Sequence, residues 1–256
     1  MARRLAKSGA KAFAATGGDA PSSGASDVTT GWVTLLVGLF ICGFLYFINH
    51  DKNRNMGFHE YNLVNTAFVL WVPLIVGMLL LRREPADIGF TVGDLGKGTL
   101  AALVCFVLFC PVIYYFAAQD GPQSYYLRWM WGSGAVENLF RDASRGFTGG
   151  RINPMNLVFH EIIMGFYMFG WEFFFRGFLL NGFRKIMPLW GAILLQAALF
   201  TALHYGKPWE ETASSFPGAI LMALIAYRFR SFVPCFLLHW FVSAGFDFAV
   251  LYHHFK

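Results

Sequence analysis

Charged residues are scarce in this sequence. Asp, Glu, Lys and Arg make up 14% of the 256 residues, whereas hydrophobic residues make up 56%. An ordinary soluble domain is about 25% charged and keeps those charges on its surface. The composition therefore excludes an ordinary soluble protein and predicts that lipid covers much of the surface.

Several familiar motifs are also absent. The sequence has no phosphate-binding G-x-x-x-x-G-K-[ST] or G-x-G-x-x-G loop, no C-x-x-C pair and no internal repeat. Its Lys and Arg are scattered at the ends of apolar segments, so the net charge of +5 indicates membrane topology and no nucleic-acid partner. The four cysteines stand singly inside apolar runs, which predicts small buried hydrophobes and neither disulfides nor zinc ligands. They are Cys42, Cys105, Cys110 and Cys235.

What the sequence does contain is a series of long apolar segments. A helix needs about 20 apolar residues to cross a bilayer. The pattern predicts an all-α, polytopic helical bundle of about seven transmembrane segments. The sixth is short, so it is tilted, buried among its neighbours, or continuous with flanking polar turns. The segments are Trp32–Ile48, Tyr61–Leu81, Gly98–Ala118, Asn156–Leu180, Leu189–His204, Phe216–Tyr227 and Phe232–Leu251.

Two other regions frame these segments. Residues 1–30 are basic and rich in Ala, Gly, Ser and Thr, which predicts a flexible tail before one transmembrane domain at 31–256. An organellar transit peptide is the alternative interpretation of the tail. The loop Gln119–Met155 holds several Trp and Tyr residues, which are typical of a segment at the headgroup level. Eleven Lys and Arg fall on the N-terminal side and eight on the other, so we expect a cytoplasmic N-terminus, in a bacterial plasma membrane.

The fourth segment carries charge within an aromatic run. Glu172 and Arg176 are four residues apart, on one face of a helix. Ionisable residues at that depth cost at least about 2.5–3.5 kcal/mol each, so they normally face the protein interior and have a function. An ion pair that only locks helix packing is the alternative.

The last segments add two imidazoles. Phe200 and His204 share a face of the fifth segment, and His239 and Ser243 share a face of the seventh, which extends to Asp247. Counted along each helix from its cytoplasmic end, Glu172 lies at a depth of about 16 Å, His204 at about 24 Å and His239 at about 10 Å. Helix tilt can close these gaps, so the three residues can share one site. A carboxylate with two imidazoles can activate water, and a His with a Ser can stabilise an oxyanion, which suits amide hydrolysis.

At these residues the sequence resembles the CPBP family of intramembrane proteases, also called Abi or type 2 CAAX-prenyl proteases. The family signatures are EExxxR, FxxxH and HxxxN/D. Here they stand as WEFFFR at 171–176, FTALH at 200–204 and HWFVS at 239–243. The resemblance covers about residues 155–250, and PADIGF at 85–90 looks like a lead-in that such proteins often carry. The resemblance to this family implies metal-independent peptide hydrolysis.

By this resemblance Glu172, His204 and His239 are the catalytic residues. Arg176, Phe200 and Ser243 support them. The chain departs from the family at two places: Trp171 replaces the Glu usually assigned to activating water, and Ser243 replaces Asn or Asp. Either Glu172 takes over as base or proteolysis is lost. Glu161 is a further candidate, as part of a substrate path, whereas His160 beside it is expected only at the polar end of the span.

The leading hypothesis is an intramembrane endopeptidase that acts on a membrane-anchored or lipidated protein. A catalytically silent member that binds a membrane partner or confers immunity is the second hypothesis, and a proton-coupled transporter with an intramembrane relay is the third. No cofactor is expected. Zinc held by Glu172, His204 and His239 is the alternative, although the sequence has no H-E-x-x-H helix.

Overall fold

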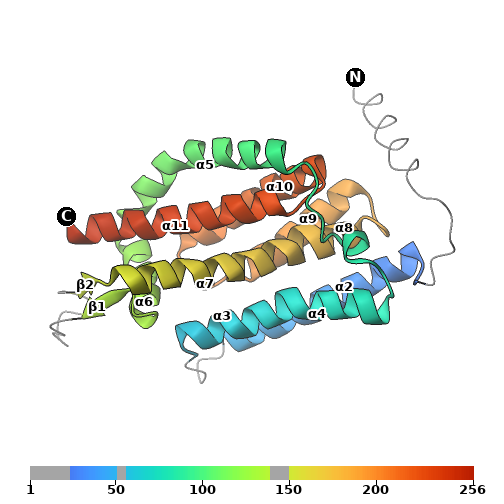
Figure 1. The fold of residues 1–256 in the computed structure, drawn as a ribbon, viewed down its shortest axis with the longest axis horizontal. Helices are drawn as coiled ribbons and strands as arrows, with labels where there is room; N and C mark the ends of the chain where they lie inside the picture. The colour runs from blue at the N-terminus through green and yellow to red at the C-terminus, as the bar shows by residue number, and fades with distance from the viewer. Residues whose placement is uncertain (1–23, 51–55, 139–149) are drawn as a thin grey trace.

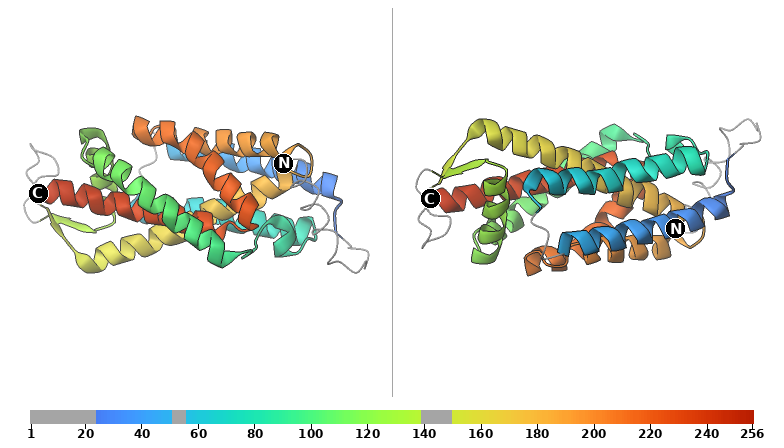
Figure 2. Two further views of the ribbon diagram at one scale, coloured as in Figure 1. Left: turned by 90° about the horizontal axis from the view of Figure 1, so that it is seen from above. Right: turned by 90° about the horizontal axis from the view of Figure 1, so that it is seen from below.

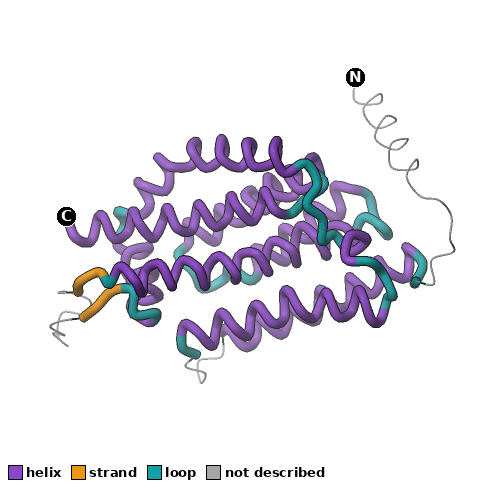
Figure 3. The backbone as a smooth tube through the Cα atoms, in the orientation of Figure 1, coloured by secondary structure: helices purple, strands orange, loops and turns teal. Residues whose placement is uncertain are grey.

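The computed structural model describes residues 24–50, 56–138 and 150–256. Helices dominate this part of the chain, and one short antiparallel hairpin of β1 and β2 accompanies them (Figure 3). The longer helices are α2 (Asp27–His50), α3 (Phe58–Thr66), α5 (Leu95–Ala117), α6 (Asp120–Gly132), α7 (Pro154–Glu172), α9 (Leu189–Ala202), α10 (Trp209–Phe229) and α11 (Val233–Phe255). The short elements are α4 (Val72–Ile75), α8 (Leu180–Phe183), β1 (Val136–Asn138) and β2 (Gly150–Ile152).

Wider and tighter helical turns connect several of these elements. The π-helical segments η1 (Ala67–Trp71) and η2 (Val76–Leu80) join α3 and α4 into one continuous span. A third π-helical segment, η4 (Phe173–Leu179), joins α7 to α8. A single 3₁₀ turn, η3 (Pro85–Ile88), precedes α5.

Five helical stretches are long and apolar enough to cross a membrane. They are Asp27–His50, Phe58–Leu80, Leu95–Ala117, Pro154–Phe183 and Val233–Phe255. The two remaining predicted segments fall on α9 and α10. The chain is therefore a polytopic helical membrane protein, and about seven segments fit it. The sixth predicted segment is the C-terminal part of α10, which is continuous with a polar first turn.

The stretch Pro154–Phe183 runs through the middle of the bundle. In Figure 1, α11 and α5 lie on one side of α7, and α2 lies with α3 and α4 on the other. The two views of Figure 2 place α9 and α10 beside this layer. Within the stretch, five phenylalanines have almost no exposed surface: Phe173, Phe174, Phe175, Phe178 and Phe183. Lipid tails are as apolar as these side chains, so the hydrophobic effect does little to hold membrane helices together. Close van der Waals packing of this kind therefore stabilises the bundle.

Outer faces of the peripheral helices show the opposite pattern. Leu36, Phe40 and Phe47 of α2, like Val107 and Leu108 of α5, are more than 60% exposed. Patches of exposed apolar side chains on this scale mark a surface that lipid or another apolar partner covers. We conclude that α2 and α5 face the bilayer.

Helix starts follow local signals in the sequence. Asn153 caps α7 by accepting a hydrogen bond from the Asn156 amide, and Pro154 occupies the first helical position. Helix α10 follows Pro208 and places two carboxylates, Glu210 and Glu211, in its first turn. Acidic residues there complement the positive end of the helix dipole.

Residues 1–23, most of the predicted tail, lie outside the described residues; helix α2 begins at Asp27, which binds Arg83 and Lys185. Two sequence-based expectations differ from the structure. The predicted loop at 119–155 contains α6 and the hairpin, which periodicity alone did not indicate. All four cysteines are free, but Cys110 is exposed on α5 and not buried, because an apolar run facing lipid cannot be told from core by composition.

Candidate functional site

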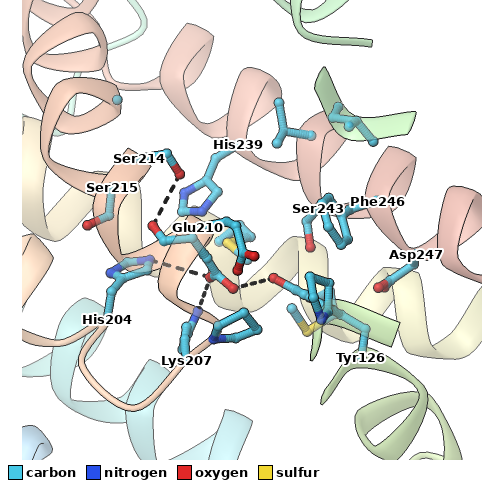
Figure 4. Close-up of a pocket in the computed structure, with 18 of the residues that line it drawn as sticks. Tyr126, His204, Lys207, Glu210, Ser214, Ser215, His239, Ser243, Phe246 and Asp247 are labelled. Carbon is cyan, nitrogen blue, oxygen red and sulfur yellow. Dashed lines mark hydrogen bonds and ion pairs between the residues drawn. The ribbon is translucent and has the colours of Figure 1, made fainter. Parts of the chain in front are cut away.

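A cavity of about 480 Å³ opens beside the polar residues of the C-terminal helices (Figure 4). Much of its wall is apolar, with Phe109, Ile113 and Phe116 on α5 and Phe246 on α11. A few polar groups interrupt that wall, as in ligand pockets generally. They include His204, Lys207, Glu210, Glu211, His239, Ser243 and Asp247.

Glu172 and Arg176 form a fully buried ion pair. Arg176 Nε lies 3.1 Å from Glu172 Oε2, and neither side chain has exposed surface. The other carboxylate oxygen, Oε1, lies 2.6 Å from His239 Nδ1. Glu172 thus has a partner on each oxygen, and it is not among the residues that line the cavity.

His239 connects the buried Glu172 carboxylate with the cavity wall. With Nδ1 donating to Glu172, the neutral ring presents an unprotonated Nε2. His239 is 17% exposed at the side chain and lines the cavity, with Ser243 one helical turn further along α11. The pair can therefore accept a proton at Nε2, and the imidazolium formed in this way can donate that proton to an oxyanion while Glu172 fixes the ring.

Phe200 packs between the charged and imidazole groups. The Arg176 guanidinium lies 4.3 Å from the centre of its ring. A cation over a desolvated aromatic face is stabilised by about 2 kcal/mol. This contact helps to hold Arg176, whose Nη1 and Nη2 have no hydrogen-bond partner within the described part of the chain. The same ring lies 4.4 Å from His204 and 5.9 Å from His239, centre to centre.

His204 is oriented by its own helix and faces a different carboxylate. Its Nδ1 lies 2.8 Å from the Phe200 carbonyl, and its Nε2 lies 3.8 Å from Glu211 Oε1. The structure thus pairs Glu172 with His239, while His204 approaches Glu211. Trp171, which is 4% exposed, places its ring 6.3 Å from the His204 ring.

Sequence reasoning missed Glu211. Its Oε1 lies 2.6 Å from Lys207 Nζ, and its Oε2 accepts a hydrogen bond from the Tyr126 hydroxyl. The dashed lines in Figure 4 mark these contacts and the approach of His204. A signal was available, because Lys207 and Glu211 stand four residues apart at the start of a helix.

A second polar group lies further along the cavity. His160 is buried, with Nε2 3.1 Å from Asp247 Oδ2 and Nδ1 2.9 Å from the Ser133 hydroxyl. His160 and Asp247 line the cavity, but Glu161 does not. Both carboxylate oxygens of Glu161 are buried and lack a hydrogen-bond partner among the residues described.

Metal ligation was the alternative for the site residues. Within the described ranges, the three-residue group whose ligand atoms lie within 4.8 Å of one another is His160, Glu161 and Asp247. The set Glu172, His204 and His239 is not such a group, since His204 is directed towards Glu211. These distances give no support for a zinc site at the predicted residues.

The helix that carries the ion pair changes its hydrogen bonding at Glu172. Residues 154–172 form an α-helix and residues 173–179 a π-helix. Such wide turns are rare and often occur at functional sites. The PADIGF segment contacts this π-helix: an added Cβ on Gly89 would lie 2.4 Å from the Gly177 carbonyl oxygen.

Together these features define a class of protein: a polytopic membrane protein with a buried Glu–Arg–His cluster beside a cavity in its bundle. Residues 154–245 match the family model described as "Type II CAAX prenyl endopeptidase Rce1-like". This match confirms the resemblance to the CPBP family over these residues. No curated protein and no solved structure matches the chain.

Proposed function

We propose that the protein is an intramembrane endopeptidase that hydrolyses a peptide bond in a membrane-anchored or lipidated protein. The observation that carries the proposal is the Glu172–His239 pair, buried on one side and open to the cavity on the other. The family match over residues 154–245 supports the same reaction.

The proposed roles follow from position. His204 helps to hold the attacking water, and His239 with Ser243 stabilises the oxyanion that forms on the substrate carbonyl. Glu172 acts through His239, because its own oxygens are engaged by His239 and Arg176. Arg176 pairs with the Glu172 carboxylate and orients it, and Phe200 packs against Arg176.

The apolar wall of the cavity supports a lipid-bearing substrate. Phe109, Ile113 and Phe116 of α5 line it, and the outer face of the same helix faces the bilayer. A prenyl chain or an apolar peptide segment can enter such a wall without burying unpaired polar groups.

We also propose an orientation. The excess of Lys and Arg on the N-terminal side supports a cytoplasmic N-terminus. The membrane we propose is a bacterial plasma membrane. With seven crossings the C-terminus at Lys256 then lies on the opposite face.

The test uses purified protein in proteoliposomes and two quenched fluorescent probes, a farnesylated CAAX peptide and an unlipidated single-span peptide. Wild-type protein should cleave at least one probe. His239→Ala should lower kcat about 10²–10⁴-fold, since it removes the group that faces the cavity. Cleavage at the wild-type rate would contradict the proposal.

His254→Ala is the matched control for that variant. It removes an imidazole from the same helix, outside the residues that line the cavity. It should retain wild-type cleavage.

A silent, partner-binding family member is the second candidate, and Trp171 favours it. Trp171 is buried, stacks on Phe175 and places no carboxylate beside His204. Folded wild-type protein that cleaves neither probe, but retains them on co-purification, would support this candidate.

A further inference from the structure

Hydrolysis requires a base with a free lone pair inside the cavity. Glu172 does not meet this requirement, because its side chain has no exposed surface and is not among the residues that line the cavity. Among the described residues that line the cavity, the carboxylates are Glu210, Glu211 and Asp247. Asp247 is hydrogen-bonded to His160, towards the other end of the cavity.

Glu211 is the carboxylate that approaches a site imidazole. Its Oε1 lies 3.8 Å from His204 Nε2, which is too long for a direct hydrogen bond. The Phe200 carbonyl accepts from His204 Nδ1–H, so Nε2 of the neutral ring is an acceptor. One water about 2.8 Å from each atom can donate to both acceptors. Its lone pairs then point away from both groups, towards the cavity.

The surroundings of Glu211 keep it ionised and in place. Lys207 pairs with Oε1, Tyr126 donates to Oε2, and the carboxylate stands in the first turn of α10. Both the cation and the helix N-terminus stabilise negative charge. Side chains of α6 and of the turn between α9 and α10 thus converge on this one carboxylate, and the dashed lines that Figure 4 draws from Tyr126, His204 and Lys207 mark these contacts.

We propose that Glu211 is the catalytic base and that Glu211 and His204 together hold the attacking water. This inference rests on the proposed function and adds a residue to it. Glu211 takes a proton from water as the water oxygen bonds to the substrate carbonyl carbon. The carbonyl electron pair moves to oxygen, beside His239 and Ser243. The C–N bond then breaks, and Glu211 returns its proton to the departing amine, which leaves an acid and an amine.

Trp171 fits this arrangement. Its ring lies edge-on to the His204 ring, 6.3 Å between centres, on the central stretch that includes α7. A carboxylate at position 171 would therefore approach the imidazole that Glu211 approaches from α10. The base is supplied from a neighbouring helix, and Trp171 packs where a carboxylate would otherwise stand.

The first experiment measures kcat and KM of Glu211→Gln on whichever probe the wild-type protein cleaves. Loss of the base should lower kcat about 10²–10⁴-fold at unchanged KM. Asp94→Asn is the matched control: it also removes a carboxylate paired with a lysine, Lys97, but on the exposed start of α5. That control should cleave normally.

The second experiment separates catalysis from structural support. Lys207→Met breaks the same ion pair but keeps the carboxylate, so cleavage should persist with its acid limb moved to higher pH. The titratable groups closest to Glu211 are Lys207, His204, Tyr126 and Tyr125. The same cavity is also lined by Tyr61, His160, Tyr167, Glu210, His239 and Asp247. This variant also tests the proposal if Glu211→Gln fails to fold.

The outcomes are distinct. A wild-type kcat in Glu211→Gln, with His239→Ala inactive, overturns the assignment of Glu211 and leaves the proposed function standing. Equal losses in Lys207→Met and Glu211→Gln, or an unmoved acid limb, overturn it as well. A wild-type protein that cleaves neither probe overturns the proposed function and this assignment together.

Discussion

Glu172 and Arg176 are the residues whose burial carries the largest energetic consequence. Both side chains are fully buried, and none of the three guanidinium nitrogens of Arg176 has a hydrogen-bond partner among the described residues, although Nε forms the ion pair with Glu172. Removing one member of a buried pair leaves an uncompensated charge, which costs about 3–5 kcal/mol. The pair is therefore needed as a unit, whatever each charge contributes by itself.

A double-mutant cycle tests this dependence. Glu172→Gln and Arg176→Met should each destabilise the folded protein by about 3–5 kcal/mol. The double variant should lose less than the sum of the two, because neither charge remains. Equilibrium unfolding in mixed micelles, followed by circular dichroism, measures the coupling.

Asp27 and Lys185 supply the matched cycle for an exposed pair. Their side chains lie 2.5 Å apart, with Asp27 65% exposed. Exposed pairs contribute at most about 1 kcal/mol. Equal coupling in the two cycles would contradict the energetic role assigned to the buried pair.

At the scale of elements, the decisive feature is the change from α- to π-helix after Glu172. The wider turns rotate the residues after position 172 relative to an α-helix of the same length. Gly89, at φ +91°, lies against Gly177 inside this π-helix. The close approach of the two backbones connects the turn before α5 to the segment that carries Arg176.

Gly89→Ala should disturb that contact. The alanine must adopt a left-handed backbone and its Cβ would meet the Gly177 backbone at under 3 Å, so the loss of stability should exceed about 1 kcal/mol. A lower thermal midpoint, measured by tryptophan fluorescence, is the expected result. Gly43→Ala, where an added Cβ meets nothing within 4 Å, is the control and should not lower the midpoint.

At the scale of the whole molecule, the exposed apolar side chains and the polar groups of the site lie in separate regions. The outer faces of α2 and α5 are apolar and exposed, whereas the polar groups gather around one cavity inside the bundle. The first described residues and the C-terminus lie at opposite ends of the molecule in Figure 1. This arrangement agrees with an odd number of crossings.

A fusion experiment tests the proposed orientation. Alkaline phosphatase attached after Lys256 should be active in a bacterial host, because it folds outside the cytoplasm. The same fusion after Arg184, at the end of α8, should be inactive. The reverse pattern would contradict a cytoplasmic N-terminus.

Much of the fold could be predicted from the sequence. Long apolar runs located the membrane helices, since every helix needs about 20 apolar residues to cross the hydrocarbon layer. The four-residue spacings of Glu172 with Arg176 and of Phe200 with His204 placed each pair on one face, because helical geometry is local. Family motifs then indicated the region that matches at 154–245.

Only the tertiary structure decided which groups face one another. Glu172 pairs with His239, 67 residues away, and Glu211 approaches His204, whereas the sequence suggested Glu172, His204 and His239 as one set. Contacts between helices depend on their tilt, rotation and the π-helical turns, none of which hydrophobic periodicity reports. The sequence by itself determined the apolar helices and their local pairs, but not α6, and tertiary packing decided which carboxylate stands beside which imidazole.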